Sequence, residues 1–163
     1  MSNPIGVGKK FGAIQDDFKP LHPYLWNNSY KVSGMEEIRR VLSQANTLIN
    51  VSSVVFRREA IPDFSSVLRY KFAGDWELYL RMCREGNIFF EREATNYFRR
   101  SSGAQTSRTV FSDLFYREHN MIMRTVNEIA GAEAASKTAT TIRKHWAHQA
   151  APGKNLNEYL SVE

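Results

Sequence analysis

The sequence predicts a single α+β domain, rich in helix, with a small mixed sheet. Its 163 residues suffice for one compact core and are too few for two ordinary domains. Apolar residues recur at helical spacing in several segments, which indicates amphipathic helices. Two segments, 48–58 and 87–98, are instead rich in β-branched and aromatic residues, as strands are. The sheet is therefore expected to be built around these two segments.

The first clear helix is predicted to begin after residue 30. Before it, three prolines interrupt the chain, so only residues 5–14 are expected to supply a strand and the rest is expected to be irregular. Ser33 and Glu36 have the spacing of a capping box, in which each side chain satisfies a free amide at the helix start. The residues that then share one helical face are Met35, Ile38, Val41, Leu42 and Ala45.

The segment from Leu48 to Phe56 is the strongest strand candidate. It is nearly continuously apolar, which is typical of a strand buried deep in a sheet. A helix is predicted from Asp75 to Glu85, with Gly86 as a left-handed C-terminal cap. A short strand, 87–91, is expected next, extended after a turn through 93–98.

The remainder of the chain is predicted to be helical. One apolar stripe runs from residue 111 to residue 129 and ends at Gly131. A second helix is expected from about Ala134 to His148, before Pro152 and Gly153. The C-terminal helical extension is accordingly placed at residues 102–163.

Composition narrows the function classes. The formal net charge is +5 and the pI is near 9.4, but the basic residues are scattered, which argues against a nucleic-acid-binding arm. The single cysteine, Cys83, excludes an internal disulfide and is expected to be a buried thiol. No segment has the length of a signal peptide core or a transmembrane span, so a cytoplasmic protein is expected. No metal site is predicted, since the pair His145 and His148 has no further ligand nearby in sequence.

Asp75 is the candidate catalytic residue. A carboxylate in the first turn of a helix is favoured by the helix dipole and commonly caps free amides, which is a purely structural role. The alternative role is that of a general base, which removes a proton from a hydroxyl group. Trp76 could offer a flat apolar face to a sugar ring, and the alternative is that it is a core side chain. Arg81 lies six positions after Asp75, so the two side chains do not share one helix face.

The order of four motifs resembles the second half of family-2 glycosyltransferase domains. The motifs are Asn50-Val51-Ser52-Ser53-Val54-Val55-Phe56-Arg57-Arg58, then Ala73-Gly74-Asp75-Trp76-Glu77-Leu78-Tyr79-Leu80-Arg81, then Gly86-Asn87-Ile88, then Asn96-Tyr97-Phe98-Arg99-Arg100. The resemblance covers residues 5–101 and implies the second half of a nucleotide-diphospho-sugar transferase fold. It implies inverting transfer of a sugar from a nucleotide-sugar donor to a glycan or lipid-linked acceptor, with Asp75 as base.

The resemblance also implies substrate-binding residues, namely Trp76, Arg81, Arg99 and Arg100, and a divalent Mg or Mn ion in the full-length family. Two positions depart from the family pattern. Gly74 stands where an acidic residue usually precedes the base, and Ser101 stands where a histidine is usual. Arg99 and Arg100 are then the candidates for contacting the diphosphate.

The Asp-x-Asp metal motif of the family is absent from the sequence. We therefore expect a fragment of the catalytic domain, without cofactor and without independent transfer activity. A non-catalytic module that binds glycans or a protein is the alternative, with Tyr24, Trp26 and Tyr30 as exposed aromatic residues. Apolar surface and unpaired strand edges are expected to be exposed, which predicts self-association, in the form of a homodimer.

Overall fold

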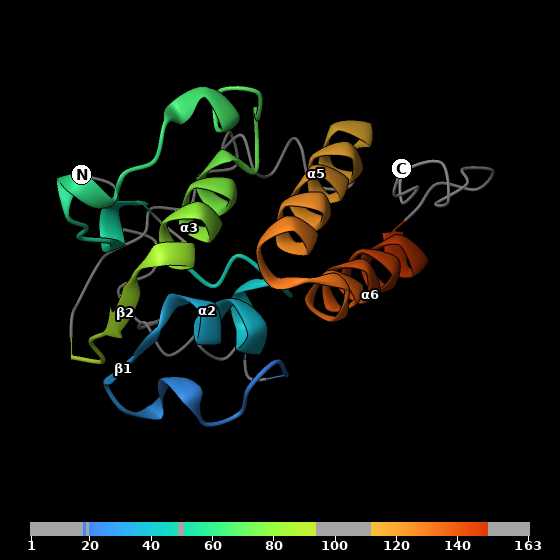
Figure 1. The fold of residues 1–163 in the computed structure, drawn as a ribbon. Coiled ribbons are helices and arrows are strands. Elements are labelled where there is room, and N and C mark those ends of the chain that lie inside the picture. The colour runs from blue at the N-terminus through green and yellow to red at the C-terminus, as the bar shows by residue number, and fades with distance from the viewer. Residues whose placement is uncertain (1–17, 19, 49–50, 94–111, 150–163) are drawn as a thin grey trace, which may run out of the picture.

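The computed structural model describes residues 18, 20–48, 51–93 and 112–149. Helix α3 (Gly74–Glu85) lies at the centre, beside α5 (Asp113–Ala130), and α6 (Ala132–Gln149) packs on α5 (Figure 1). A two-stranded sheet lies at the far end of α3 from its first residue. The α+β class, rich in helix, is thus confirmed for the described part of the chain.

The sheet differs from the predicted one. Strand β1 (Tyr30–Ser33) pairs with β2 (Asn87–Phe90), and the two strands are antiparallel. The register places Tyr30 opposite Phe90, and their rings stack with centroids 5.4 Å apart. The strand predicted at 87–91 is therefore confirmed, whereas β1 was not predicted. Residues 5–14 and 94–98, where further strand was expected, lie outside the described residues.

The prediction of a buried strand at 48–58 is wrong. Residues Val51–Ser53 and Arg58–Ala60 form short 3₁₀ turns, and the side chains of residues 55–58 are exposed. A β-branched segment forms a strand only when a neighbouring strand supplies hydrogen bonds and a packing surface. The only strand pairing among the described residues, between β1 and β2, does not include this segment. Two more 3₁₀ turns lie at Leu25–Asn27 and Phe64–Ser66.

The predicted helix start at Ser33 is confirmed. The Ser33 hydroxyl accepts a hydrogen bond from the amide of Glu36 at 3.2 Å, and α2 (Gly34–Glu37) begins there. The helix then widens into a π-helical turn over Ile38–Leu42. Ile38, Val41 and Leu42 are fully buried, so the predicted apolar face is the face that packs into the core.

The two C-terminal helices pack against each other, and both contribute side chains to the core. Ser112 caps α5 by accepting from the amide of Phe115, as Ser N-caps do. Gly131 separates α5 from α6 and has φ = +85°, in a region that favours glycine. The helix predicted over residues 111–129 was expected to end at Gly131, and this end is confirmed. The main core collects side chains from the π-helical turn, α3, α5 and α6, among them Ile38, Leu80, Ile122, Val126 and Ala139.

Gly86 does not form the predicted left-handed cap. Its φ of −117° and ψ of −172° are extended, because the chain passes directly from α3 into β2. Its carbonyl accepts a hydrogen bond from the amide of Gly34 at 2.8 Å, which joins the end of α3 to the start of α2. A side chain at Gly34 has no room, since an added Cβ would lie 2.0 Å from the backbone oxygen of Cys83.

The substitution Gly34→Ala tests this contact. Because backbone rather than a flexible side chain occupies the space, we expect it to lower the free energy of unfolding by about 3 kcal/mol. Urea denaturation followed by circular dichroism measures the change. Gly86→Ala is the matched control. Its expected loss of unfolding free energy is at most about 1 kcal/mol, since an added Cβ would lie 3.3 Å from its nearest atom, the backbone oxygen of Met82. Equal losses in the two variants would contradict this packing.

Candidate functional site

Asp75 lies in the first turn of α3, as predicted. The helix runs from Gly74, and the Oδ1 atom of Asp75 accepts a hydrogen bond from the amide of Trp76 at 2.8 Å. The side chain is half-buried. Burial raises the pKa of this carboxyl above its usual value, although hydrogen bonds from the Trp76 amide and the Asn46 side chain oppose the shift. The group is therefore more basic than an exposed aspartate, which suits a proton acceptor.

Tyr79 lies one helical turn after Asp75. Side chains in a helix lean towards its N-terminus, so Tyr79 is directed back over the turn that carries Asp75. It is 2% exposed, and its hydroxyl has no hydrogen-bond partner within the described ranges. Burial, and then the negative charge of Asp75, raise the pKa of Tyr79. The hydroxyl thus stays protonated near the carboxylate and can donate a hydrogen bond.

Asn46 approaches Asp75 from the segment that follows the π-helical turn. That segment is fixed to α3 by the indole of Trp76, whose Nε1 donates to the Leu42 carbonyl at 2.8 Å. Asn46 Oδ1 and Thr47 Oγ1 are buried and make no hydrogen bond to any residue the structure describes. Buried polar atoms normally have a partner, either protein, water or ligand. Asp75, Asn46 and Tyr79 therefore form a polar site with hydrogen-bonding capacity to spare.

Trp76 is a core side chain and not an exposed platform for a sugar. It is 4% exposed, its Nε1 is bonded to Leu42, and its ring meets His119 edge-on with centroids 5.5 Å apart. The amphipathic pattern of α3 explains this position, since Leu80 and Cys83 share the face of Trp76 that packs into the core. Trp26 is likewise buried, whereas Tyr24 is exposed as predicted.

Arg81 contacts two glutamates instead of Asp75. Its Nε donates to Glu77 Oε1 at 2.6 Å and its guanidinium lies 3.5 Å from Glu128 on α5. Arg81 therefore does not join the Asp75 cluster, which agrees with the six-residue spacing. Its role in substrate binding stays a prediction, as do those of Arg99 and Arg100, which lie outside the described residues.

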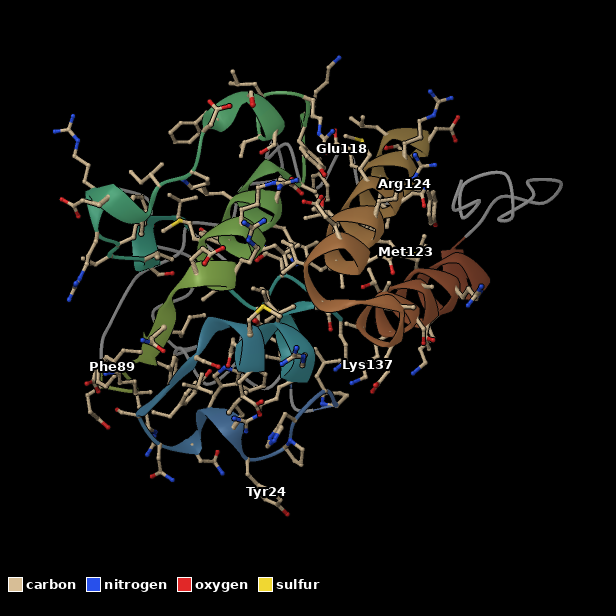
Figure 2. The ribbon with its side chains drawn as sticks, viewed as in Figure 1. Tyr24, Phe89, Glu118, Met123, Arg124 and Lys137 are labelled. Carbon is tan, nitrogen blue, oxygen red and sulfur yellow. The ribbon has the colours of Figure 1, made fainter. Side chains whose placement is uncertain are left out.

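Glu118 is the site residue that the sequence analysis missed. Its carboxylate accepts hydrogen bonds from three consecutive backbone amides, those of Lys71, Phe72 and Ala73, at 2.7, 2.8 and 2.7 Å. Figure 2 shows Glu118 on α5, close to the start of α3. Three amides that point to one anion form a backbone nest, which fixes the chain just before Asp75.

A signal for Glu118 is present in the sequence. It occupies a position three residues after Phe115 and four before Ile122, on the apolar stripe of the helix. An acidic residue in such a stripe must be paired when buried, because an unpaired buried charge is very costly. Glu77 follows the same rule on α3: it is fully buried and binds Arg81 and the hydroxyl of Tyr70.

No protein-family model, curated protein sequence or solved structure matches this chain. No helix of the described residues is long and apolar enough to cross a membrane. The candidate site therefore rests on its own geometry and on the sequence motifs.

Replacing Glu118 tests the nest. Glu118→Gln leaves one carbonyl oxygen for three amides and adds a donor group that faces them. We expect the free energy of unfolding to fall by about 2–4 kcal/mol, since hydrogen bonds to charged groups contribute about 1.5–3 kcal/mol each. Urea denaturation measures it. Glu128→Gln, in the same helix and more than half exposed, is expected to change stability by about 0.5 kcal/mol at most. A loss of that small size in Glu118→Gln would contradict the nest.

The raised pKa of Asp75 predicts a pH-dependent effect of Asp75→Asn. A carboxyl whose pKa is higher in the folded state stabilises the fold below its unfolded pKa, and this contribution is lost as pH rises through the folded pKa. We therefore expect Asp75→Asn to gain stability relative to the parent protein as pH rises from 3 to 7. Thermal unfolding across this range measures the difference.

Asp63→Asn is the control of opposite sign. Hydrogen bonds from the side chain and amide of Ser65 lower the pKa of the exposed Asp63 carboxyl. Its contribution to stability is present above the unfolded pKa and is lost as pH falls through the folded pKa, so the variant should lose stability relative to the parent as pH rises. The same trend in both variants would contradict the desolvation of Asp75.

Proposed function

We propose that this chain is the acceptor-side part of an inverting glycosyltransferase, in which Asp75 is the general base. The observation that carries the proposal is the half-buried carboxylate of Asp75 at the start of α3, with a raised pKa and two unsatisfied polar neighbours. The order of the four sequence motifs supports the same reaction class. The fold alone would not support it, because function depends on the site.

In the proposed reaction, an acceptor hydroxyl of a glycan or lipid-linked glycan attacks the anomeric carbon of a nucleotide sugar. The new bond joins the acceptor oxygen to this carbon, the bond from the carbon to the diphosphate breaks, and the nucleoside diphosphate leaves with the electron pair. Asp75 takes the proton of the hydroxyl as the new bond forms. Asn46, which hydrogen-bonds to Asp75, and the neighbouring Tyr79 keep the carboxylate in place for this step.

Metal binding is assigned to no residue of this chain. The resemblance implies a divalent ion beside the donor diphosphate. Within the described ranges, no group of three or more His, Cys, Asp or Glu side chains could hold such an ion, and the sequence contains no Asp-x-Asp. The proposal therefore limits this chain to binding the acceptor and removing its proton, and predicts no transfer by the chain alone.

The test joins the chain to the nucleotide-binding half of a family-2 glycosyltransferase that carries Asp-x-Asp. We expect the fusion to transfer sugar with Mg²⁺ or Mn²⁺, and Asp75→Asn to lower kcat by about 10²–10⁴-fold with little change in the acceptor KM. Release of nucleoside diphosphate, followed with a panel of nucleotide sugars and glycans, measures both parameters.

The matched control is Asp113→Asn. Asp113 lies in the first turn of α5, as Asp75 does in α3, but it is exposed. It should leave kcat within about twofold, because a loss of helix-dipole stabilisation costs only about 0.3–1 kcal/mol of folding energy. Unchanged transfer in Asp75→Asn would exclude Asp75 as the base. Glycan binding without transfer by any fusion would instead favour the non-catalytic binding module.

A further inference from the structure

An exposed apolar segment runs outside α3. We call residues 51–71 the arm. Five of the seven large apolar side chains that are exposed in the described residues belong to it: Val51, Val55, Phe56, Phe64 and Leu68. Val55 is fully exposed and Leu68 is 80% exposed. Such a concentration of exposed apolar side chains marks a binding surface in a stable domain.

The arm is attached to the domain at several points. Val54 packs against the main core, beside the fully exposed Val55. Tyr70 is buried and donates its hydroxyl proton to Glu77 at 3.0 Å, and Lys71 is held by Glu118 through its amide. Figure 1 shows the arm along α3 and over its first turn, and its last residue, Lys71, reaches α5 through Glu118. The apolar side chains are therefore presented by an ordered support.

The charge of the arm selects among possible occupants. It carries four basic residues, Arg57, Arg58, Arg69 and Lys71, and two acidic ones, Glu59 and Asp63; of the basic residues, Arg69 pairs with the buried Glu77 at 3.7 Å. In a two-fold dimer formed through the arm, the same positive surface of each copy would face the other, which is unfavourable. A nucleic acid would neutralise the arginines but would offer little apolar surface to Val55 and Leu68. An anionic bilayer offers negative charge at its surface and an apolar phase beneath it.

We propose that the arm docks this domain on an anionic phospholipid surface. The side chains of Val55, Phe64 and Leu68 enter the boundary between the headgroups and the acyl chains, and Arg57 and Arg58 contact lipid phosphates. Neither arginine makes an ion pair with a described residue. The proposal is independent of the reaction proposed for Asp75.

The test is co-sedimentation of the whole chain with vesicles. Vesicles of phosphatidylcholine containing 30% phosphatidylglycerol are compared with pure phosphatidylcholine, at low and high salt. We expect binding to the anionic vesicles alone, weakened by salt. The double variant Val55→Ser, Leu68→Ser should lower the partition coefficient at least tenfold. Arg57→Gln with Arg58→Gln should lower it about 30-fold, since each basic residue near the surface contributes about 1 kcal/mol.

Matched controls lie elsewhere on the surface. Tyr24 and Phe89 are 74% and 65% exposed, and Figure 2 places both away from the arm. Tyr24→Ser with Phe89→Ser, and Lys31→Gln with Arg39→Gln, should leave binding within twofold. Absence of binding to anionic vesicles, or equal losses in arm and control variants, would overturn the proposal. So would a dimer in sedimentation velocity that Val55→Ser, Leu68→Ser dissolves, since the arm would then be a protein interface.

Discussion

The carboxylate of Glu118 and the three amides that it binds fix the segment that leads into α3. Backbone amides of an irregular segment have no partner within a helix, and those that are buried must find acceptors elsewhere. Here the acceptor comes from α5, 45–47 residues later in the chain. One side chain thus sets the distance between α3 and α5 and fixes the last residues of the arm. The position of Asp75, two residues after Ala73, follows from it.

Two further buried glutamates attach the helices to the segments that precede them. The hydroxyl of Tyr30 donates to Glu37 at 2.9 Å, and that of Tyr70 donates to Glu77 at 3.0 Å. In both pairs the tyrosine precedes the helix, and the glutamate lies in the helix, seven residues after the tyrosine. Burial raises the pKa of Glu37, and burial together with the charge of Glu37 raises the pKa of Cys83 to about 12. Cys83 is therefore a protonated core thiol, as its apolar surroundings predict.

Local sequence signals predicted the helices well because those signals act within a few residues. The capping at Ser33 and the glycine end at Gly131 depend on neighbouring backbone groups alone. The sheet could not be predicted in this way, because β1 and β2 are more than fifty residues apart and each needs the other. The same dependence explains why residues 51–58, with the highest strand propensity, are not a strand in the described structure.

The candidate site shows a similar division. The helix start placed Asp75 correctly from sequence, whereas Asn46 and Tyr79 became visible only through packing. Trp76 follows Asp75 directly, so it points to a different side of α3 and enters the core while Asp75 remains half-buried. The bond from Trp76 to Leu42 then holds the Asn46 segment against this helix turn.

Asp75 of the polar site and Trp76 of the core are therefore neighbours in sequence, but one is half-buried and the other is fully packed in the core. The buried indole fixes the position of the carboxylate, and partial burial of the carboxylate raises its pKa. The helix dipole and the amide of Trp76 act in the opposite sense and stabilise the charged form. A general base requires this balance, since it must be ionised before the reaction and basic enough to accept a proton during it. The start of α3 brings both opposing influences to the carboxyl of Asp75.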